Sequence, residues 1–232
     1  MNLLAFETAT ERCSVALLSD GRLLERSVLA PRRHAELALP MASELLAEAG
    51  LARAALDGIA VGRGPGAFTG VRLAISLAQG IAYALDRPVL PISTLAALAE
   101  QAPRVADRVL ALLDARMGEL YVAAFARGAD GELALCGPER VATPEQLALP
   151  PAPRWHVVGT GWEAQSERLA AAWPHAVERV IVAEARWPEA RDIALLAAPR
   201  LAHGDGVAPE QALPVYLRDK VAETQAERAA KA

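Results

Sequence analysis

The stretch that decides the fold is Asp57–Arg87, which reads DGIAVGRGPGAFTGVRLAISLAQGIAYALDR. It predicts a short apolar strand at Ile59–Val61, a glycine-rich turn, and a helix from about Ala67 to Leu85 without a charge after Leu73. Glycines let another backbone or an anion approach closely, and a helix start after such a turn offers free N–H groups. A helix that is apolar on nearly every side must be covered by its own domain or by another chain. The stretch therefore predicts either a phosphate site or an interface.

The glycine-rich turn fits neither of two nucleotide-binding motifs. A P-loop needs Gly-Lys-Ser or Gly-Lys-Thr at the helix start, where this chain has Phe68-Thr69-Gly70. The G-x-G-x-x-G motif fails because Gly70 follows Gly66 one residue too late. Two interpretations remain open. One is a phosphate on the helix N-terminus beside Arg63 or Arg72, and the other is a tight strand-to-helix corner with close packing.

Composition and charge limit the classes of protein. With 232 residues, 53% of them hydrophobic, the chain can bury a sizeable core. A net charge of −4 gives no overall positive field toward nucleic acid or membrane. Cys13 and Cys136 are far apart in sequence and in no metal-ligand spacing, which predicts two reduced, buried thiols in a cytoplasmic protein. The uncharged Leu73–Leu85 run is shorter than a membrane span, so we expect no membrane contact.

The predicted strands and helices follow the order β-β-β-α-β-α twice. The first strand of one half ends on Glu7, and that of the other half ends on Asp114. This order predicts a duplicated α/β fold with two mixed sheets, of the actin-like, sugar-kinase-like ATPase (RNase H-like) type. In that plan both acids point into a cleft between the halves. We place the halves at residues 1–102 and 103–232, with the last residues available to pack back on the first half.

No sequence pattern indicates a catalytic or metal centre. None of the four histidines has a second histidine four residues on, as a helical metal site would require. No G-x-S-x-G motif for a nucleophilic serine occurs. The Glu7-Thr8-Ala9-Thr10 segment fits either a metal-bound phosphate or a turn whose hydroxyls bond to their own backbone. We expect no metal and no cofactor.

Two predicted helices of the first half, Arg33–Ala49 and Ala67–Leu85, carry apolar faces that suit either the chain's own sheet or a partner. On the second, small residues recur every four positions from Gly70 to Ala82, and such a stripe permits a close helix approach. The candidate interface residues are Leu37, Met41, Leu45, Gly70, Leu73, Ala74, Leu77, Ala78 and Ile81.

Several segments of the chain resemble the bacterial TsaB (YeaZ) family. They are GRGPGAFTGVRLAISLAQGIAYAL, the opening LAFETATERCSVALLSDG, the helix start RRHAELALPM, the strand pair LLDARMGELYVAAF and the late PVYLRDKVA. The resemblance covers most of the chain and is strongest from Leu3 to Ile92. It implies the duplicated actin-like fold. It also implies a subunit of the machinery that places threonylcarbamoyl on the adenosine beside the anticodon of tRNAs that read ANN codons.

The resemblance also implies partners and a role. The catalytic paralogue TsaD transfers the group from threonylcarbamoyl-adenylate, and the small ATPase TsaE completes the set. The family member is implied to be non-catalytic, to support TsaD as a heterodimer and to form homodimers when alone. Both dimers would use the helices that match Arg33–Ala49 and Ala67–Leu85. The chain would meet tRNA only indirectly, through the complex.

A vestigial nucleotide cleft is the last feature that the resemblance implies, made of Glu7, Thr8, Arg63, Gly64, Asp114 and Gly159. The catalytic paralogue has a metal-binding histidine pair, of which only His34 is present here. Its adenosine loop ends in Asn, where this chain has Gly159-Thr160-Gly161-Trp162. These gaps favour an accessory subunit over an enzyme. The alternative is an active ATPase or small-molecule kinase of the same fold. A metalloprotease, an older label of the wider family, is disfavoured by the missing histidine.

Overall fold

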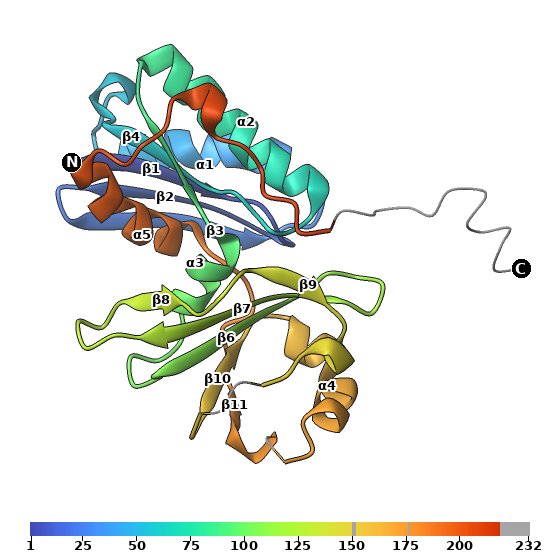
Figure 1. The fold of residues 1–232 in the computed structure, drawn as a ribbon. Coiled ribbons are helices and arrows are strands. Elements are labelled where there is room, and N and C mark those ends of the chain that lie inside the picture. Colours follow the sequence, from blue (N-terminus) through green and yellow to red (C-terminus); the bar gives the residue numbers. More distant parts are fainter. Residues whose placement is uncertain (150–151, 176, 219–232) are drawn as a thin grey trace, which may run out of the picture.

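Two β-sheets face each other across a layer of helices in the computed structural model, which describes residues 1–149, 152–175 and 177–218 (Figure 1). The first part of the chain forms β1 (Asn2–Glu7), β2 (Arg12–Ser19), β3 (Arg22–Leu29), α1 (His34–Glu48), η1 (Arg53–Ala55), β4 (Gly58–Gly62), α2 (Phe68–Leu85), β5 (Val89–Ile92) and α3 (Thr94–Glu100). The rest forms β6 (Arg108–Asp114), β7 (Leu120–Arg127), β8 (Leu133–Leu135), β9 (Arg140–Ala142), η2 (Pro144–Gln146), β10 (Trp155–Val158), α4 (Gly161–Ala172), η3 (Val177–Arg179), β11 (Val180–Val182), α5 (Ala190–His203) and η4 (Pro209–Gln211).

Strand order is the same in the two sheets, which confirms the predicted duplication. The first sheet has the order β3-β2-β1-β4-β5, and the second has β8-β7-β6-β10-β11 with β9 also paired to β7. In each sheet the first three strands are antiparallel and the last three are parallel. The halves differ between the third and fourth strands. There the first half has α1, whereas the described residues of the second half have β9 and the short turn η2.

Alternating side chains along β1 belong to two separate cores. Leu4 and Phe6 are buried on the side of α1 and α2, whereas Leu3 and Ala5 are buried against α5. A strand covered on both faces carries apolar residues without a polar alternation. This explains why the chain opens with a continuous apolar run.

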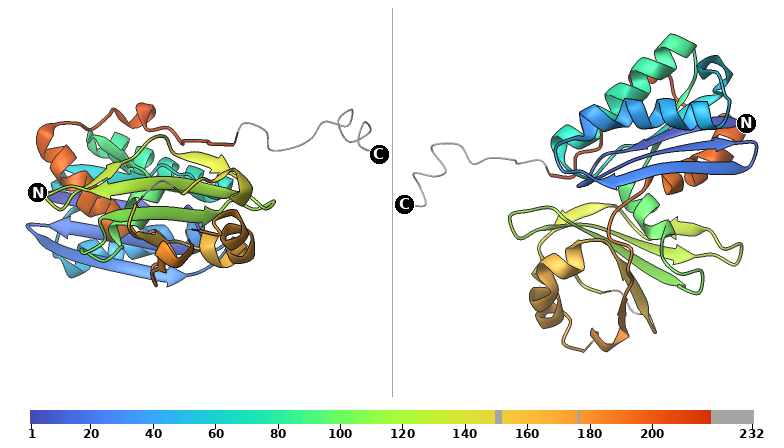
Figure 2. Two further views of the ribbon diagram at one scale, coloured as in Figure 1. Left: turned by 60° about the horizontal axis from the view of Figure 1, so that its bottom comes forward. Right: turned by 180° about the vertical axis from the view of Figure 1, so that it is seen from behind.

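Two helices, α3 and α5, are exchanged between the halves. α5 follows the second sheet in sequence but packs on β1, β2 and β4 of the first sheet. α3 follows the first sheet but packs on β6 and β7 of the second. Both lie between the sheets, whereas α1 and α2 cover the outer face of the first sheet and α4 covers the outer face of the second (Figures 1 and 2). A division at residue 102 therefore separates the strands of the two sheets but not their helices.

The helix α2 begins at Phe68 and is therefore longer than the uncharged run Leu73–Leu85. With 18 residues and a mean hydropathy of 1.3, it could span a membrane by length and composition alone. Its buried residues, among them Ala74, Ile75 and Ala78, form part of the core on the first sheet. A core helix of a soluble protein passes the same test, so α2 is weak evidence for a membrane span.

Candidate functional site

The glycine-rich turn before α2 packs directly on the loop that follows β1. A Cβ added to Gly66 would lie 2.5 Å from the backbone oxygen of Ala9, and one on Gly70 would overlap the backbone oxygen of Thr8. The Ala67 N–H donates to the same Ala9 oxygen at 2.7 Å. The chain's own backbone therefore occupies the space that the glycines leave open. This geometry favours the tight corner over the phosphate cradle.

Glu7, predicted to point into a cleft, is completely buried beside this corner. Its Oε1 accepts from the Ala9 N–H at 2.6 Å, and its Oε2 accepts from the Thr94 hydroxyl at 3.0 Å. Burial raises the pKa of the Glu7 carboxyl to about 7. A Cβ on Gly62 would overlap this carboxyl. Glu7 thus ties β1 to the start of α3, and an outside ligand cannot reach it, contrary to the prediction.

Thr8 and Gly64, two further residues of the predicted cleft, serve the same corner. The Thr8 hydroxyl donates to a backbone oxygen of α2 at 2.7 Å. Gly64 has a φ of +92°, and its N–H donates to the Thr94 hydroxyl at 3.2 Å. Arg63 turns away toward the second half, where its Nη2 lies 3.6 Å from Oε2 of Glu139. Glu7, Thr8 and Gly64 are therefore brought together by packing.

Asp114, the second acid, lies partly exposed at the end of β6 and already has a cation. Nη1 of Arg116 lies 3.0 Å from Oδ2 of Asp114, and Nη2 lies 2.8 Å from Oε1 of Glu11. One guanidinium thus bridges carboxylates of the two halves. Gly159 has a φ of +98°, and a Cβ there would overlap a backbone oxygen of β6, so this glycine also serves close packing.

Metal-ligating residue types are scattered through the structure. Among the residues it describes, no group of three or more His, Cys, Asp or Glu side chains could hold a metal ion. His34 lies at the start of α1, while His156 lies on β10, where burial lowers its pKa. Cys13 is buried as predicted, but Cys136 is exposed because it follows the short edge strand β8.

The small-residue stripe of α2 faces the chain's own core. Ala74 and Ala78 are fully buried there, and so is Leu45 on α1. These three cannot contact a partner, which corrects the predicted interface. The other predicted residues stay partly exposed: Leu37, Met41, Gly70, Leu73, Leu77 and Ile81.

The outward side of α2 was missed by the sequence prediction. It carries a second series of small residues at four-residue spacing, Ser76, Gly80 and Ala84, all exposed. Tyr83 beside them is 80% exposed, and Leu39 on α1 is 47% exposed. The four-residue spacing was visible in the sequence, but only the packing shows which series faces outward.

The repeated strand order and the exchanged helices define a protein of the duplicated actin-like (RNase H-like) class. A family model described as TsaD, tRNA N6-adenosine threonylcarbamoyltransferase, matches residues 28–226. The tRNA threonylcarbamoyladenosine biosynthesis protein TsaB of Escherichia coli (strain K12) is 41% identical, over 96% of this chain and 96% of that protein. TsaB of Haemophilus influenzae is 43% identical over 72% of this chain and 75% of that protein.

Solved structures give the same assignment. YeaZ from Pseudomonas aeruginosa is 48% identical, with a TM-score of 0.82 over 93% of this chain and 99% of that one. A crystal structure described as an uncharacterized protein with similarity to peptidase YEAZ, also from Pseudomonas aeruginosa, is 48% identical, with a TM-score of 0.85 over 94% and 99%. The chain belongs to the TsaB (YeaZ) family, as its sequence segments predicted.

Proposed function

We propose that this chain is an accessory subunit in the threonylcarbamoyl modification of the adenosine beside the anticodon in tRNAs that read ANN codons. The observation that carries this proposal is the 41% identity to Escherichia coli TsaB over 96% of both chains. That relative is named for threonylcarbamoyladenosine biosynthesis on tRNA. In this role the chain supports the catalytic paralogue TsaD in the cytoplasm by forming a heterodimer with it. It contacts TsaE and tRNA only through that complex, and it forms a homodimer when TsaD is absent.

The geometry of the two acids supports a non-catalytic role. Glu7 is buried and hydrogen-bonded within the corner, and Asp114 is paired with Arg116. The start of α2 is covered by the loop after β1, so it offers no open phosphate cradle. The alternative, an ATPase or small-molecule kinase, needs acids open to a metal-bound phosphate, and no observation favours it.

The outer face of α1 and α2 is the surface we propose for the partner. Both helices lie on the outer face of the first sheet (Figure 1). Leu37, Met41, Leu73, Leu77 and Ile81 are partly exposed there, and Leu39 and Tyr83 are more exposed. Small residues at Ser76, Gly80 and Ala84 let another helix approach closely. Protein interfaces are enriched in aromatic residues such as Tyr83.

The test is a binding measurement with purified TsaD. The unmodified chain should form a stable complex with TsaD on size-exclusion chromatography and should hydrolyse no ATP alone with Mg²⁺ present. Ala84→Arg adds bulk and charge on the outer face and should weaken the complex tenfold or more, about 1.4 kcal/mol. Ala202→Arg, at an exposed position of α5, is the matched control and should bind normally. Equal binding by the two variants would remove this surface from the proposal, and ATP turnover by the chain alone would overturn the non-catalytic role.

A further inference from the structure

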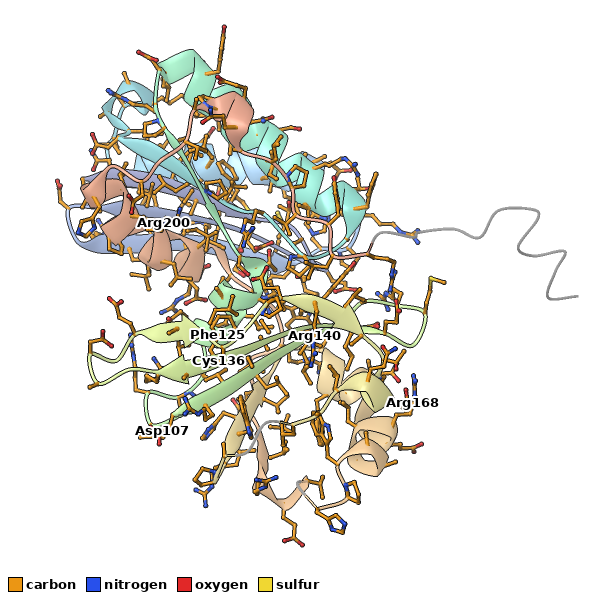
Figure 3. All side chains as sticks on the ribbon, viewed as in Figure 1. Asp107, Phe125, Cys136, Arg140, Arg168 and Arg200 are labelled. Atoms are coloured by element: carbon orange, nitrogen blue, oxygen red, sulfur yellow. The ribbon has the colours of Figure 1, made fainter. Side chains whose placement is uncertain are left out.

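A cavity of about 480 Å³ lies at the rim of the first sheet, where its lining residues Arg63 and Ser93 adjoin Gly64 and Thr94 of the corner around Glu7. Its walls come from the turn after β4, the end of β5, the start of α3 and the middle of α5. They include Arg63, Pro91, Ser93, Ala96, Leu196 and Arg200. Figure 3 labels Arg200 on α5. The volume falls in the range of about 300–1,000 Å³ that is typical of small-molecule sites.

Two arginines from different elements, Arg63 after β4 and Arg200 on α5, line this cavity. Arg200 on α5 is held by a hydrogen bond from its Nη1 to the backbone oxygen of Pro91 at 3.0 Å, and no carboxylate among the described residues pairs with it. Arg63 is fixed through its backbone, since its N–H donates to the Ile92 oxygen at 2.8 Å and its oxygen accepts from the Val215 N–H at 2.9 Å. Hydrogen bonds therefore hold the Arg200 guanidinium and the Arg63 backbone in place before any ligand arrives.

Charge in the cavity is only partly balanced. Oε2 of Glu139, whose side chain is 8% exposed, lies 3.6 Å from Nη2 of Arg63, beyond hydrogen-bond distance. The Ser93 hydroxyl donates to the same carboxylate, which fixes it. Two guanidinium groups and one carboxylate leave a single unbalanced positive charge. The other wall residues, such as Pro91, Ala96 and Leu196, are apolar.

We propose that this cavity binds a small organic monoanion, a carboxylate that carries an apolar body. The carboxylate would lie between the guanidinium groups of Arg63 and Arg200, because a guanidinium offers paired N–H donors that match carboxylate oxygens. The apolar walls would cover the body of the ligand. A dianion such as a phosphate monoester fits less well because Glu139 repels its second charge. This inference goes beyond the proposed function and does not depend on it.

Benzoate and its neutral isostere benzamide are the probes for this site. Ligand-observed NMR on the full-length chain should give a Kd for benzoate on the order of 1 mM, as expected for so small a ligand. Benzamide should bind at least tenfold more weakly because it lacks the charge. Equal binding of the two, or no binding of benzoate at about 20 mM, would overturn the proposal.

Variants locate the site. Arg200→Gln should weaken benzoate binding tenfold or more, and Arg200→Lys, which keeps the charge but loses the paired donors, should fall between it and the unmodified chain. Arg191→Gln on the same helix is the matched control, because Arg191 lies outside the cavity and should leave binding unchanged. Thermal melting checks that each variant is folded. Benzoate binding by Arg200→Gln as tight as that of the unmodified chain would exclude this cavity.

A second arm tests the charge balance. Phenyl phosphate, a dianion above about pH 7, should bind the unmodified chain more weakly than benzoate. Glu139→Gln removes the opposing carboxylate and should raise the affinity for phenyl phosphate several-fold. If phenyl phosphate already binds the unmodified chain more tightly than benzoate, the proposed ligand class is wrong.

Discussion

The two halves end their first strands on an acid, yet they place the two acids in opposite surroundings. Glu7 is completely buried and takes hydrogen bonds from a backbone N–H and from Thr94. Asp114 is partly exposed and is paired with Arg116, which also reaches Glu11 of the first half. Matching strand order therefore preserves the position of an acid without preserving its chemistry. Sequence symmetry predicted the duplicated sheets correctly, but the prediction that both acids point into one cleft does not hold for the buried Glu7.

The largest expected effect comes from breaking the corner that buries Glu7. In Gly70→Ala the new methyl group would overlap the backbone oxygen of Thr8, so we expect a loss of about 3 kcal/mol or more in the free energy of unfolding. Gly80→Ala is the matched control on the same helix, because nothing lies within 4 Å of the added methyl group. It should stabilise the protein by about 0.5–1 kcal/mol. Urea denaturation measures both, and a Gly70→Ala variant as stable as the control would contradict the close packing.

The next largest effect is a pH dependence of the free energy of unfolding that is caused by Glu7. Its pKa is raised from 4.5 to about 7 in the folded protein, so the folded state binds the proton more tightly than the unfolded state. The free energy of unfolding should therefore fall as pH rises from 4.5 to 7, by about 3 kcal/mol at 1.4 kcal/mol per pH unit. Glu7→Gln removes this contribution, so its stability relative to the unmodified chain should improve across that window.

Denaturation curves at several pH values between about 4 and 8 measure this difference. Asp192 on α5 is a second buried carboxyl whose pKa is raised to about 7, chiefly by burial, so Asp192→Asn gives an independent comparison. If the stability of Glu7→Gln and of the unmodified chain changed in parallel with pH, the Glu7 carboxyl would not be the buried group that the structure describes.

The smallest effect on stability is expected at Asp114, the partly exposed acid of the second half. Arg116→Gln removes the ion pairs with Asp114 and Glu11. Arginine and glutamine both carry a side chain, so the backbone strain at a φ of +62° is the same in the two proteins. The Arg116 side chain is 72% exposed, and exposed ion pairs contribute little, so the loss should stay below about 1 kcal/mol. It should shrink further in about 1 M salt, where charges are screened. A loss as large as that of Gly70→Ala would mean that Arg116 holds the halves together.

Local sequence signals predicted most element positions because those signals act over a few residues. The strand predicted at Ile59–Val61 lies within β4, and the helices predicted at Arg33–Ala49 and Ala67–Leu85 match α1 and α2 to within one residue at each end. Ser93, a residue type that favours helix starts, caps α3 by accepting from two backbone N–H groups. Asp86 ends α2 in the left-handed conformation.

The features that the sequence did not predict depend on contacts between distant residues. Thr94 meets Glu7 across 87 positions, and no local pattern indicates that pair. The two small-residue series of α2 look alike in sequence, and only the position of the first sheet decides that Ala74 and Ala78 face inward. The exposure of Cys136 likewise depends on where β8 lies at the edge of its sheet.

The exchange of α5 has a consequence for synthesis on the ribosome. The face of the first sheet that carries Leu3, Ala5 and Leu90 is covered mainly by α5, which is translated after the whole second sheet. About 100 residues separate β5 from α5, so at about 5–20 residues per second most of this apolar face stays bare for about 5–20 seconds in a growing chain. The N-terminal half cannot finish folding when it emerges. It must wait, uncovered or shielded by a chaperone, until nearly the last helix has left the exit tunnel.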